Sequence, residues 1–245
     1  MKITAPHGYG EIVPLQKTHR VRLPGGATPP FCRALNAIAV SCAEFVPAGR
    51  DYPIAFASLD NARTFAPVAV LGLEAAQNLF VDAAGQWDPG AYVPAFVRRY
   101  PFCISKLYVD GEPRGERVVC VASACVDPGG DPLFDAQGAA TPAWRASERL
   151  LVEYEADLDR TARLCAALER MQLFEPFTVQ SVGGAAPEVS LAGLYRVSET
   201  KLADLKPASH KILAAHGFTG LVHAHLHSLR NFSRLAGRRS ARGRG

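Results

Sequence analysis

The sequence predicts an α+β fold, a single domain built mainly on an antiparallel sheet of meander and hairpins, with a long helix at about 142–171 and C-terminal helices packed on it. Short apolar or alternating runs joined by short polar links favour antiparallel pairing. Apolar residues between 142 and 171 recur every three, four or seven positions, which is the helical period. Since no long linker interrupts these elements, we expect one domain over residues 1–237.

The first half of the chain supplies the predicted meander. Asp51–Ala57 alternates large and small side chains, Pro67–Leu73 is its expected partner, and Asn78–Asp82 is the expected third strand. The preceding run, 31–45, is compatible with either a strand or a short helix, because its alanines and β-branched residues point in opposite directions.

Further pairs and helices follow. A short helix is expected over 92–99, a hairpin from 102–109 and 117–126, and two more strands at 177–182 and 191–197.

Thr141 followed by Pro142 is a helix start signal for the long helix. A shorter helix is expected near Leu202, another after Pro207, and a last one over 221–236.

The charge is unevenly distributed. The chain carries 27 basic and 23 acidic residues, and the segment 238–245 holds four arginines and no acid, so residues 1–237 have 27 − 4 = 23 basic against 23 acidic residues. We therefore expect a neutral folded body with a disordered basic tail at 238–245. Nucleic-acid binding is not favoured, because the body lacks a pattern of basic residues interleaved with aromatics.

The six cysteines form no CxxC pair, and several lie in apolar runs where a free thiol behaves as a small hydrophobe. A reduced chain is the simplest interpretation, although an even number of cysteines is also compatible with disulfides. Pro6, Gly8 and Gly10 interrupt the N-terminal segment, so it does not read as a signal peptide. With no run of 18 apolar residues for a membrane helix, we expect a cytoplasmic protein.

Polar residues that could bind a ligand concentrate near the first predicted strand and the 92–99 helix. A neighbouring Glu and Asp can act as an acid and a base, or can serve as ordinary electrostatics at a strand end. Adjacent arginines in a helix lie about 100° apart. We therefore expect one to be buried against a carboxylate while the other reaches solvent or an anionic ligand. The candidate ligand-binding residues are His19, Glu44, Asp51, Arg98, Arg99 and Tyr100.

The sequence His223-Ala-His225-Leu-His227 is the strongest metal-like pattern. Its flanking residues favour a helix, in which His223 and His227 share a face while His225 lies on the apolar face with Val222 and Leu229. No carboxylate follows Asp204, so a metal would need distant ligands. We expect no metal and no cofactor, and keep His223 and His227 only as weak candidates.

Complete catalytic motifs are absent from the sequence. It contains no GxSxG, no GxxxxGK[ST] and no GxGxxG after a predicted strand. We therefore assign no catalytic residue.

Several segments are distinctive as a set: VPLQKTH at 13–19, AEFVPAGRDYPIAF at 43–56, VAVLGLEAAQNLFVD at 68–82, Trp87, YVPAFVRRYPF at 92–102, PLFD at 132–135, GLYRVSETKLADL at 193–205 and VHAHLHSLRN at 222–231. Together they resemble the bacterial SapC family over nearly the whole chain. The family takes its name from an association with surface layers. Its members tend to lie in gene neighbourhoods with TonB-dependent receptors, flavin-dependent tryptophan halogenases and cupin-like oxygenases, and the resemblance implies no catalytic residues.

The resemblance and the missing catalytic motifs together favour a non-catalytic accessory or binding protein. We expect it to work in the cytoplasm with a protein partner of an envelope, surface-layer or TonB-dependent uptake system. The alternative is an enzyme with a polar cleft near Arg98–Tyr100 that acts on a small anionic or peptide substrate.

Overall fold

The computed structural model describes residues 2–60, 64–109, 112–181 and 189–242 and confirms the α+β class, with antiparallel pairing throughout its named strands. The chain divides into two compact units. Unit 1 comprises Met1–Cys32 and Ala95–Ala156, and unit 2 comprises Arg33–Pro94 and Asp157–Gly245. The boundary falls inside the long helix α3 (Pro142–Arg170), which matches the predicted helix. Compactness does not show independent folding, so the single domain stays a prediction.

Unit 1 contains a four-stranded sheet in the order β1-β7-β8-β2, formed by β1 (Lys2–Ile3), β2 (Ile12–Pro14), β7 (Phe102–Val109) and β8 (Glu112–Ala122). A two-stranded sheet pairs β3 (Arg20–Val21) with β9 (Asp131–Pro132). The short helices are η1 (Pro30–Ala34), which continues into unit 2, α2 (Ala95–Arg98) and η3 (Ser123–Cys125). Its core is an apolar cluster of Val21, Phe102, Val121, Leu133, Trp144 and Leu151.

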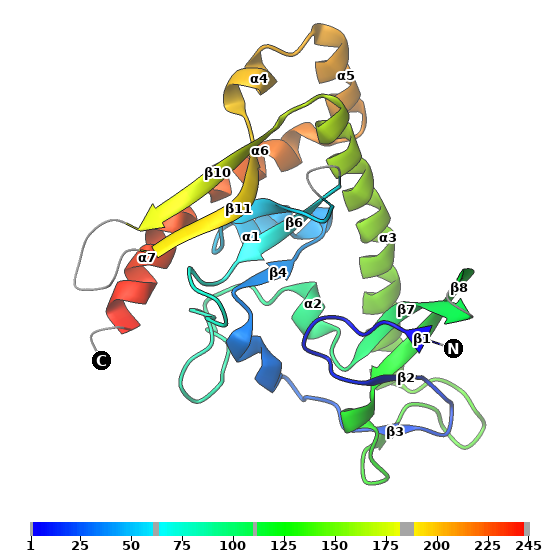
Figure 1. Ribbon diagram of the computed structural model, residues 1–245. Helices are drawn as coiled ribbons and strands as arrows, with labels where there is room; N and C mark the ends of the chain where they lie inside the picture. The colour runs from blue at the N-terminus through cyan, green and yellow to red at the C-terminus, as the bar shows by residue number, and fades with distance from the viewer. Residues whose placement is uncertain (1, 61–63, 110–111, 182–188, 243–245) are drawn as a thin grey trace. The chain divides into compact units, whose positions relative to one another are not determined.

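Unit 2 contains a five-stranded sheet in the order β10-β11-β5-β6-β4. Its strands are β4 (Ala37–Ala39), β5 (Ile54–Ser58), β6 (Phe65–Val70), β10 (Phe174–Ser181) and β11 (Val189–Val197). Its remaining helices are η2 (Cys42–Glu44), α1 (Phe45–Gly49), α4 (Glu199–Ala203), α5 (Pro207–Ala215), α6 (Thr219–Ser228) and α7 (Asn231–Arg242). Figure 1 shows β10 and β11 as a long ribbon at the edge of this sheet.

The predicted third strand of the meander, Asn78–Asp82, is wrong. This segment forms only an isolated bridge, between Val81 and Trp87. The Asn78 side-chain oxygen accepts a hydrogen bond from the Phe80 backbone N–H at 2.9 Å, a local turn that competes with strand pairing. The free side of β6 is paired instead with β4, which comes from the run 31–45 whose structure the sequence left open.

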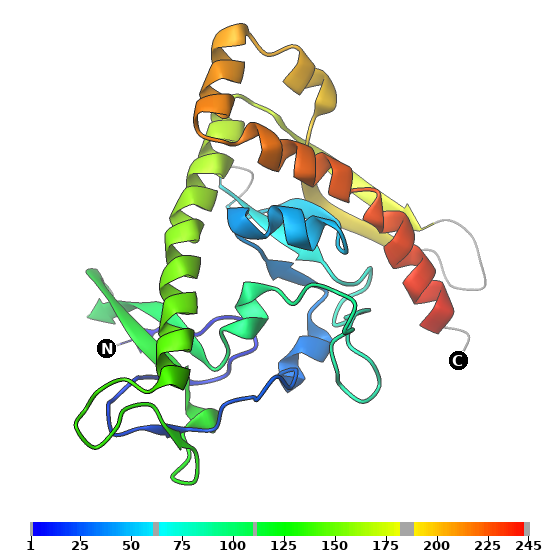
Figure 2. The same cartoon turned by 180° about the vertical axis from the view of Figure 1, so that it is seen from behind.

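The C-terminal helices also differ from expectation. The predicted helix 221–236 is two helices, α6 and α7, with Leu229 and Arg230 between them. The main contacts of α6 are with α1, α5, β5 and β11, so it packs on the sheet rather than chiefly on α3 (Figure 2). Among the helices of the described residues, none combines the length and apolarity needed to cross a membrane.

Residues 238–242 belong to α7, whereas the sequence predicts a disordered tail there, and residues 243–245 lie outside the described residues. Arg238 Nη2 donates to Asp88 at 2.8 Å, and Arg239 Nε donates to Glu74 at 2.5 Å. Arg242 donates to two backbone carbonyls of the same loop. Asp88 and Glu74 therefore compensate the charges of Arg238 and Arg239 locally. A count of charges along the chain does not reveal this pairing, because the acids lie far from the arginines in the sequence.

Candidate functional site

The six candidate ligand-binding residues divide between the two units. His19, Arg98, Arg99 and Tyr100 belong to unit 1, and Glu44 and Asp51 belong to unit 2. Each group is therefore described within its own unit.

Arg98 and Arg99 diverge as the helical geometry predicts. Arg98 is exposed, whereas Arg99 is 7% exposed, with Nη1 3.7 Å from Glu155 Oε1. The Arg99 guanidinium carbon lies 4.6, 5.1 and 5.8 Å from the ring centroids of Tyr154, Phe96 and Tyr9. Arg99 is thus held inside unit 1 by three aromatic faces and a carboxylate, a position in which it serves the packing of the unit.

Tyr100 and His19 serve local structure. The Tyr100 hydroxyl lies 3.2 Å from Cys125 Sγ, its ring packs edge-on against Tyr9 at 5.1 Å, and burial raises the pKa of its phenol. His19 Nδ1 accepts a hydrogen bond from the Gln16 backbone N–H at 3.3 Å and so closes a turn.

Glu44 and Asp51 meet on one residue of unit 2, Tyr92. The Tyr92 hydroxyl donates to Glu44 Oε1 at 3.2 Å, and the Tyr92 backbone N–H donates to Asp51 Oδ2 at 2.9 Å. Glu44 is 3% exposed, and its other oxygen accepts from both the backbone N–H and the hydroxyl of Ser41. Glu44 precedes α1 and Asp51 follows it, so the two carboxylates fasten the segment around Tyr92 to both ends of this helix.

The three histidines of α6 are separated by the helix. His223 and His227 are exposed, and His225 is completely buried. No group of three metal-ligating side chains occurs in the part of the chain that the structure describes. The residue with the most distinctive geometry is therefore the middle histidine, which the sequence places on the apolar face.

His225 is inserted between β5 and β11. The pairs Leu194–Ala57 and Tyr195–Phe56 set a register that would place Val197 opposite Ile54. Instead, the Val197 N–H donates to His225 Nε2 at 3.1 Å, and His225 Nδ1 lies 2.8 Å from the Ile54 carbonyl oxygen. Since Nε2 accepts, the neutral ring carries its hydrogen on Nδ1 and donates it to Ile54. Burial, with a smaller effect of Arg196, lowers the pKa of His225 to about 4.

This histidine predicts a pH dependence of stability. The pKa of His225 is about 4 in the folded protein and 6.5 as a model value, so between these pH values the unfolded chain binds the extra proton. Stability is then full above pH 6.5 and falls as the pH drops towards 4, by about 3 kcal/mol in total. Urea denaturation at several pH values from 4.5 to 7.5 measures this change in the free energy of unfolding. A His225→Leu variant isolates the effect, and parallel curves for the two proteins would contradict it.

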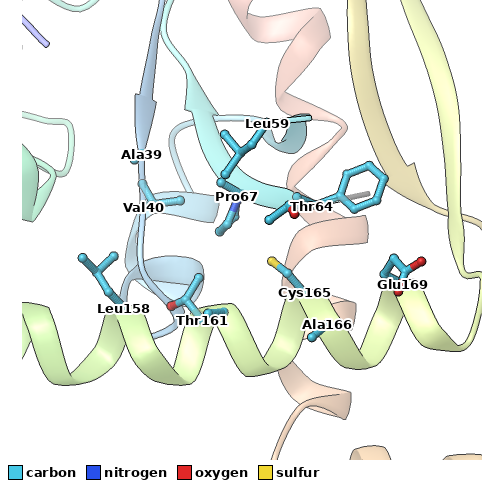
Figure 3. A pocket seen from close by; sticks show the side chains of 13 residues that line it. Ala39, Val40, Leu59, Thr64, Pro67, Leu158, Thr161, Cys165, Ala166 and Glu169 are labelled. Carbon is cyan, nitrogen blue, oxygen red and sulfur yellow. The ribbon is translucent and has the colours of Figure 1, made fainter. Parts of the chain in front are cut away.

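The described residues of unit 2 also line a pocket between α3 and the sheet, with a cavity volume of about 310 Å³. Figure 3 shows Leu158, Thr161, Cys165, Ala166 and Glu169 following one another along α3, opposite side chains of the strands. The small side chains on this face of the helix leave the space open. We call it the α3 pocket, and its lining residues are Ala39, Val40, Leu59, Thr64, Phe65, Ala66, Pro67, Leu158, Thr161, Ala162, Cys165, Ala166 and Glu169.

The polar groups on the wall of the α3 pocket are mostly engaged by the protein. Thr161 Oγ1 accepts from the Cys42 backbone N–H at 2.8 Å and donates to the Asp157 carbonyl oxygen at 2.7 Å. Thr64 Oγ1 donates to Asp60 at 2.8 Å. Burial raises the pKa of the Cys165 thiol to about 12, so the sulfur is a neutral thiol at physiological pH. This chemistry suits binding of apolar groups.

The α3 pocket is not among the sites that the sequence predicts. Leu158 and Cys165 belong to the apolar positions of the long helix that recur every three, four or seven residues, an apolar stripe along one face. The missed signal is that Ala162 and Ala166, four residues apart, flank that stripe with side chains too small to fill the space.

The family model for SapC matches residues 17–235, which is most of the chain. The chain belongs to the SapC family. No curated protein and no solved structure matches it. The matched range includes every lining residue of the α3 pocket and all six candidate ligand-binding residues, so SapC membership covers both units.

Proposed function

We propose that this SapC protein is a non-catalytic binding protein. It works as an accessory of a bacterial envelope, surface-layer or TonB-dependent uptake system, acts from the cytoplasm with a protein partner, and uses the α3 pocket as its binding site. The observation that carries the proposal is the apolar pocket itself, formed where small side chains of α3 face β4 and β6. The choice of system rests on the family resemblance.

The size and lining of the α3 pocket support binding. A volume of about 310 Å³ is within the range of sites that hold small ligands or an inserted apolar side chain. Leu59, which lines the pocket, is 66% exposed, so an occupant would cover apolar surface that now faces solvent. Each square ångström of apolar surface covered contributes about 25 cal/mol, which makes this a favourable place for an apolar group.

The first test uses a neutral apolar dye. Nile red is expected to bind the purified full chain with a blue-shifted, enhanced emission. The Ala166→Trp variant is expected to bind it at least about tenfold more weakly, because an indole would occupy the pocket. Ala215→Trp is the matched control: Ala215 is exposed on α5 and does not line the pocket.

Equal dye binding by the wild type and Ala166→Trp would contradict the pocket as the binding site. Circular dichroism of both tryptophan variants checks that they fold. The accessory role is tested separately by cross-linking in living cells. Cross-links to envelope or uptake proteins that Ala166→Trp loses and Ala215→Trp keeps are expected, and recovery of free monomer alone would count against the role.

A further inference from the structure

The α3 pocket opens towards a second cavity with different chemistry. This second cavity has a volume of about 400 Å³ and shares Phe65 and Glu169 with the α3 pocket. We call it the polar cavity, and its lining residues are Phe65, Glu169, Gln172, Phe174, Tyr195 and Lys201. The two spaces therefore adjoin at Glu169, with apolar lining on one side and polar side chains on the other.

The apolar part is elongated along the helix. Leu158 and Glu169 mark the two ends of the wall that α3 provides (Figure 3). Glu169 follows Leu158 by eleven positions of the helix, a length of about 16 Å at 1.5 Å per residue. Since Thr161 and Thr64 already make their hydrogen bonds within the protein, an occupant of this part gains mainly by burying apolar surface.

Glu169 is the acidic side chain at the junction. It is exposed, and within the described ranges no hydrogen bond or ion pair involves its carboxylate. Lys201, the cation of the polar cavity, instead donates to the Phe174 carbonyl oxygen at 3.3 Å. Lys201 also contributes to lowering the pKa of Glu175, which places its charge near a second carboxylate. Of the two charged side chains that line the polar cavity, only Glu169 also lines the α3 pocket, so the charge next to the apolar part is negative.

We propose that the α3 pocket binds a small amphiphile whose apolar chain lies along α3 and whose positively charged ammonium group pairs with Glu169. This ligand class deepens the proposed binding function and rests on it. The ammonium would stay partly hydrated at the exposed junction, so its pairing with Glu169 adds selectivity while the buried chain supplies most of the affinity.

Three eight-carbon probes with different head groups test the proposal: octylamine, which is charged at pH 7, neutral 1-octanol and anionic octanoate. Isothermal titration calorimetry on the full chain at low salt is expected to show octylammonium binding about tenfold more tightly than 1-octanol. Glu169→Gln is expected to remove this difference. The matched control Glu199→Gln keeps it, since Glu199 is exposed on α4 and lines neither cavity.

The outcomes separate the ligand class from the binding function. If 1-octanol binds as tightly as octylammonium, or if octanoate binds more tightly, the ammonium preference is overturned while the pocket remains a binding site. If none of the probes binds the wild type, the ligand class and the proposed binding function both fail. An ammonium preference that survives in Glu169→Gln also overturns the assignment to Glu169.

Discussion

Replacing His225 by leucine is expected to lower the free energy of unfolding by about 4 kcal/mol, because two buried backbone groups lose their partners. Leucine can fill the space of the ring but can neither accept from the Val197 N–H nor donate to the Ile54 carbonyl. Each unsatisfied buried group costs about 1–3 kcal/mol. Urea denaturation at pH 7.5, followed by circular dichroism, measures the change.

The effect is specific to the middle histidine of α6. His227→Leu is the matched control, because His227 is exposed on the same helix, and it should change stability by less than about 0.5 kcal/mol. A His225→Leu variant as stable as the control would show that β5 and β11 pair directly once the ring is gone. The His225 ring between the two strands would then not be needed for the stability of unit 2.

The helices α6 and α7 are fastened to α1 and β5 by more side chains than His225. Ser228 Oγ accepts from the Ile54 N–H at 2.9 Å, so both polar backbone groups of Ile54 bond to side chains of α6. Asn231 Nδ2 donates to the carbonyl oxygens of Gly49 and Tyr52 at 2.8 and 3.2 Å. His225 and Ser228 thus replace bonds that a neighbouring strand would make to Ile54, whereas Asn231 bonds to the end of α1 and to the turn before β5. Together the three side chains fix where the C-terminal helices lie in unit 2.

Elements with a local signal could be predicted from the sequence. The apolar spacing and the Thr141-Pro142 start signal predict α3 to within one residue of its observed end. Both signals depend only on residues of the helix and its first turn, so no tertiary contact is needed to predict it. The segment Asn78–Asp82 misleads because a short apolar run does not distinguish a strand from a buried turn. The break between α6 and α7 has no Gly or Pro to mark it, and it coincides with the tertiary bonds of Ser228 and Asn231.

In the candidate sites, too, features that depend on local geometry could be predicted, and features that depend on tertiary contacts could not. The divergence of Arg98 and Arg99 could be predicted, since it depends only on helical geometry. The aromatic rings around Arg99 could not, because Tyr9 and Tyr154 are far apart in the sequence. The spacing of Ala162 and Ala166 indicates a wall of small side chains on α3, but the α3 pocket also depends on which strands face that wall, and this cannot be read from the spacing.

Replacing Arg99 by alanine is expected to lower the free energy of unfolding by about 3 kcal/mol, since it removes a buried side chain from three aromatic faces and from Glu155. Glu155 limits the loss, because Arg117 Nη1 also donates to it, at 2.8 Å. Urea denaturation followed by the fluorescence of Trp144, in the core of unit 1, measures the change in a Trp87→Phe background. Arg98→Ala, at an exposed position, is the control and should cost less than about 0.5 kcal/mol.

An Arg99→Met variant separates the packing of Arg99 from its charge. Within the described residues, the buried Arg99 Nε has no hydrogen-bond partner, and Nη1 lies 3.7 Å from Glu155, so one donor of the guanidinium is left unsatisfied and the ion pair is long. Methionine keeps a similar length and packs well against aromatic rings. We expect it to cost at least about 2 kcal/mol less than alanine, since an apolar side chain of similar volume often replaces a buried ion without loss. If both variants cost the same, the cation rather than the packed side chain stabilises unit 1.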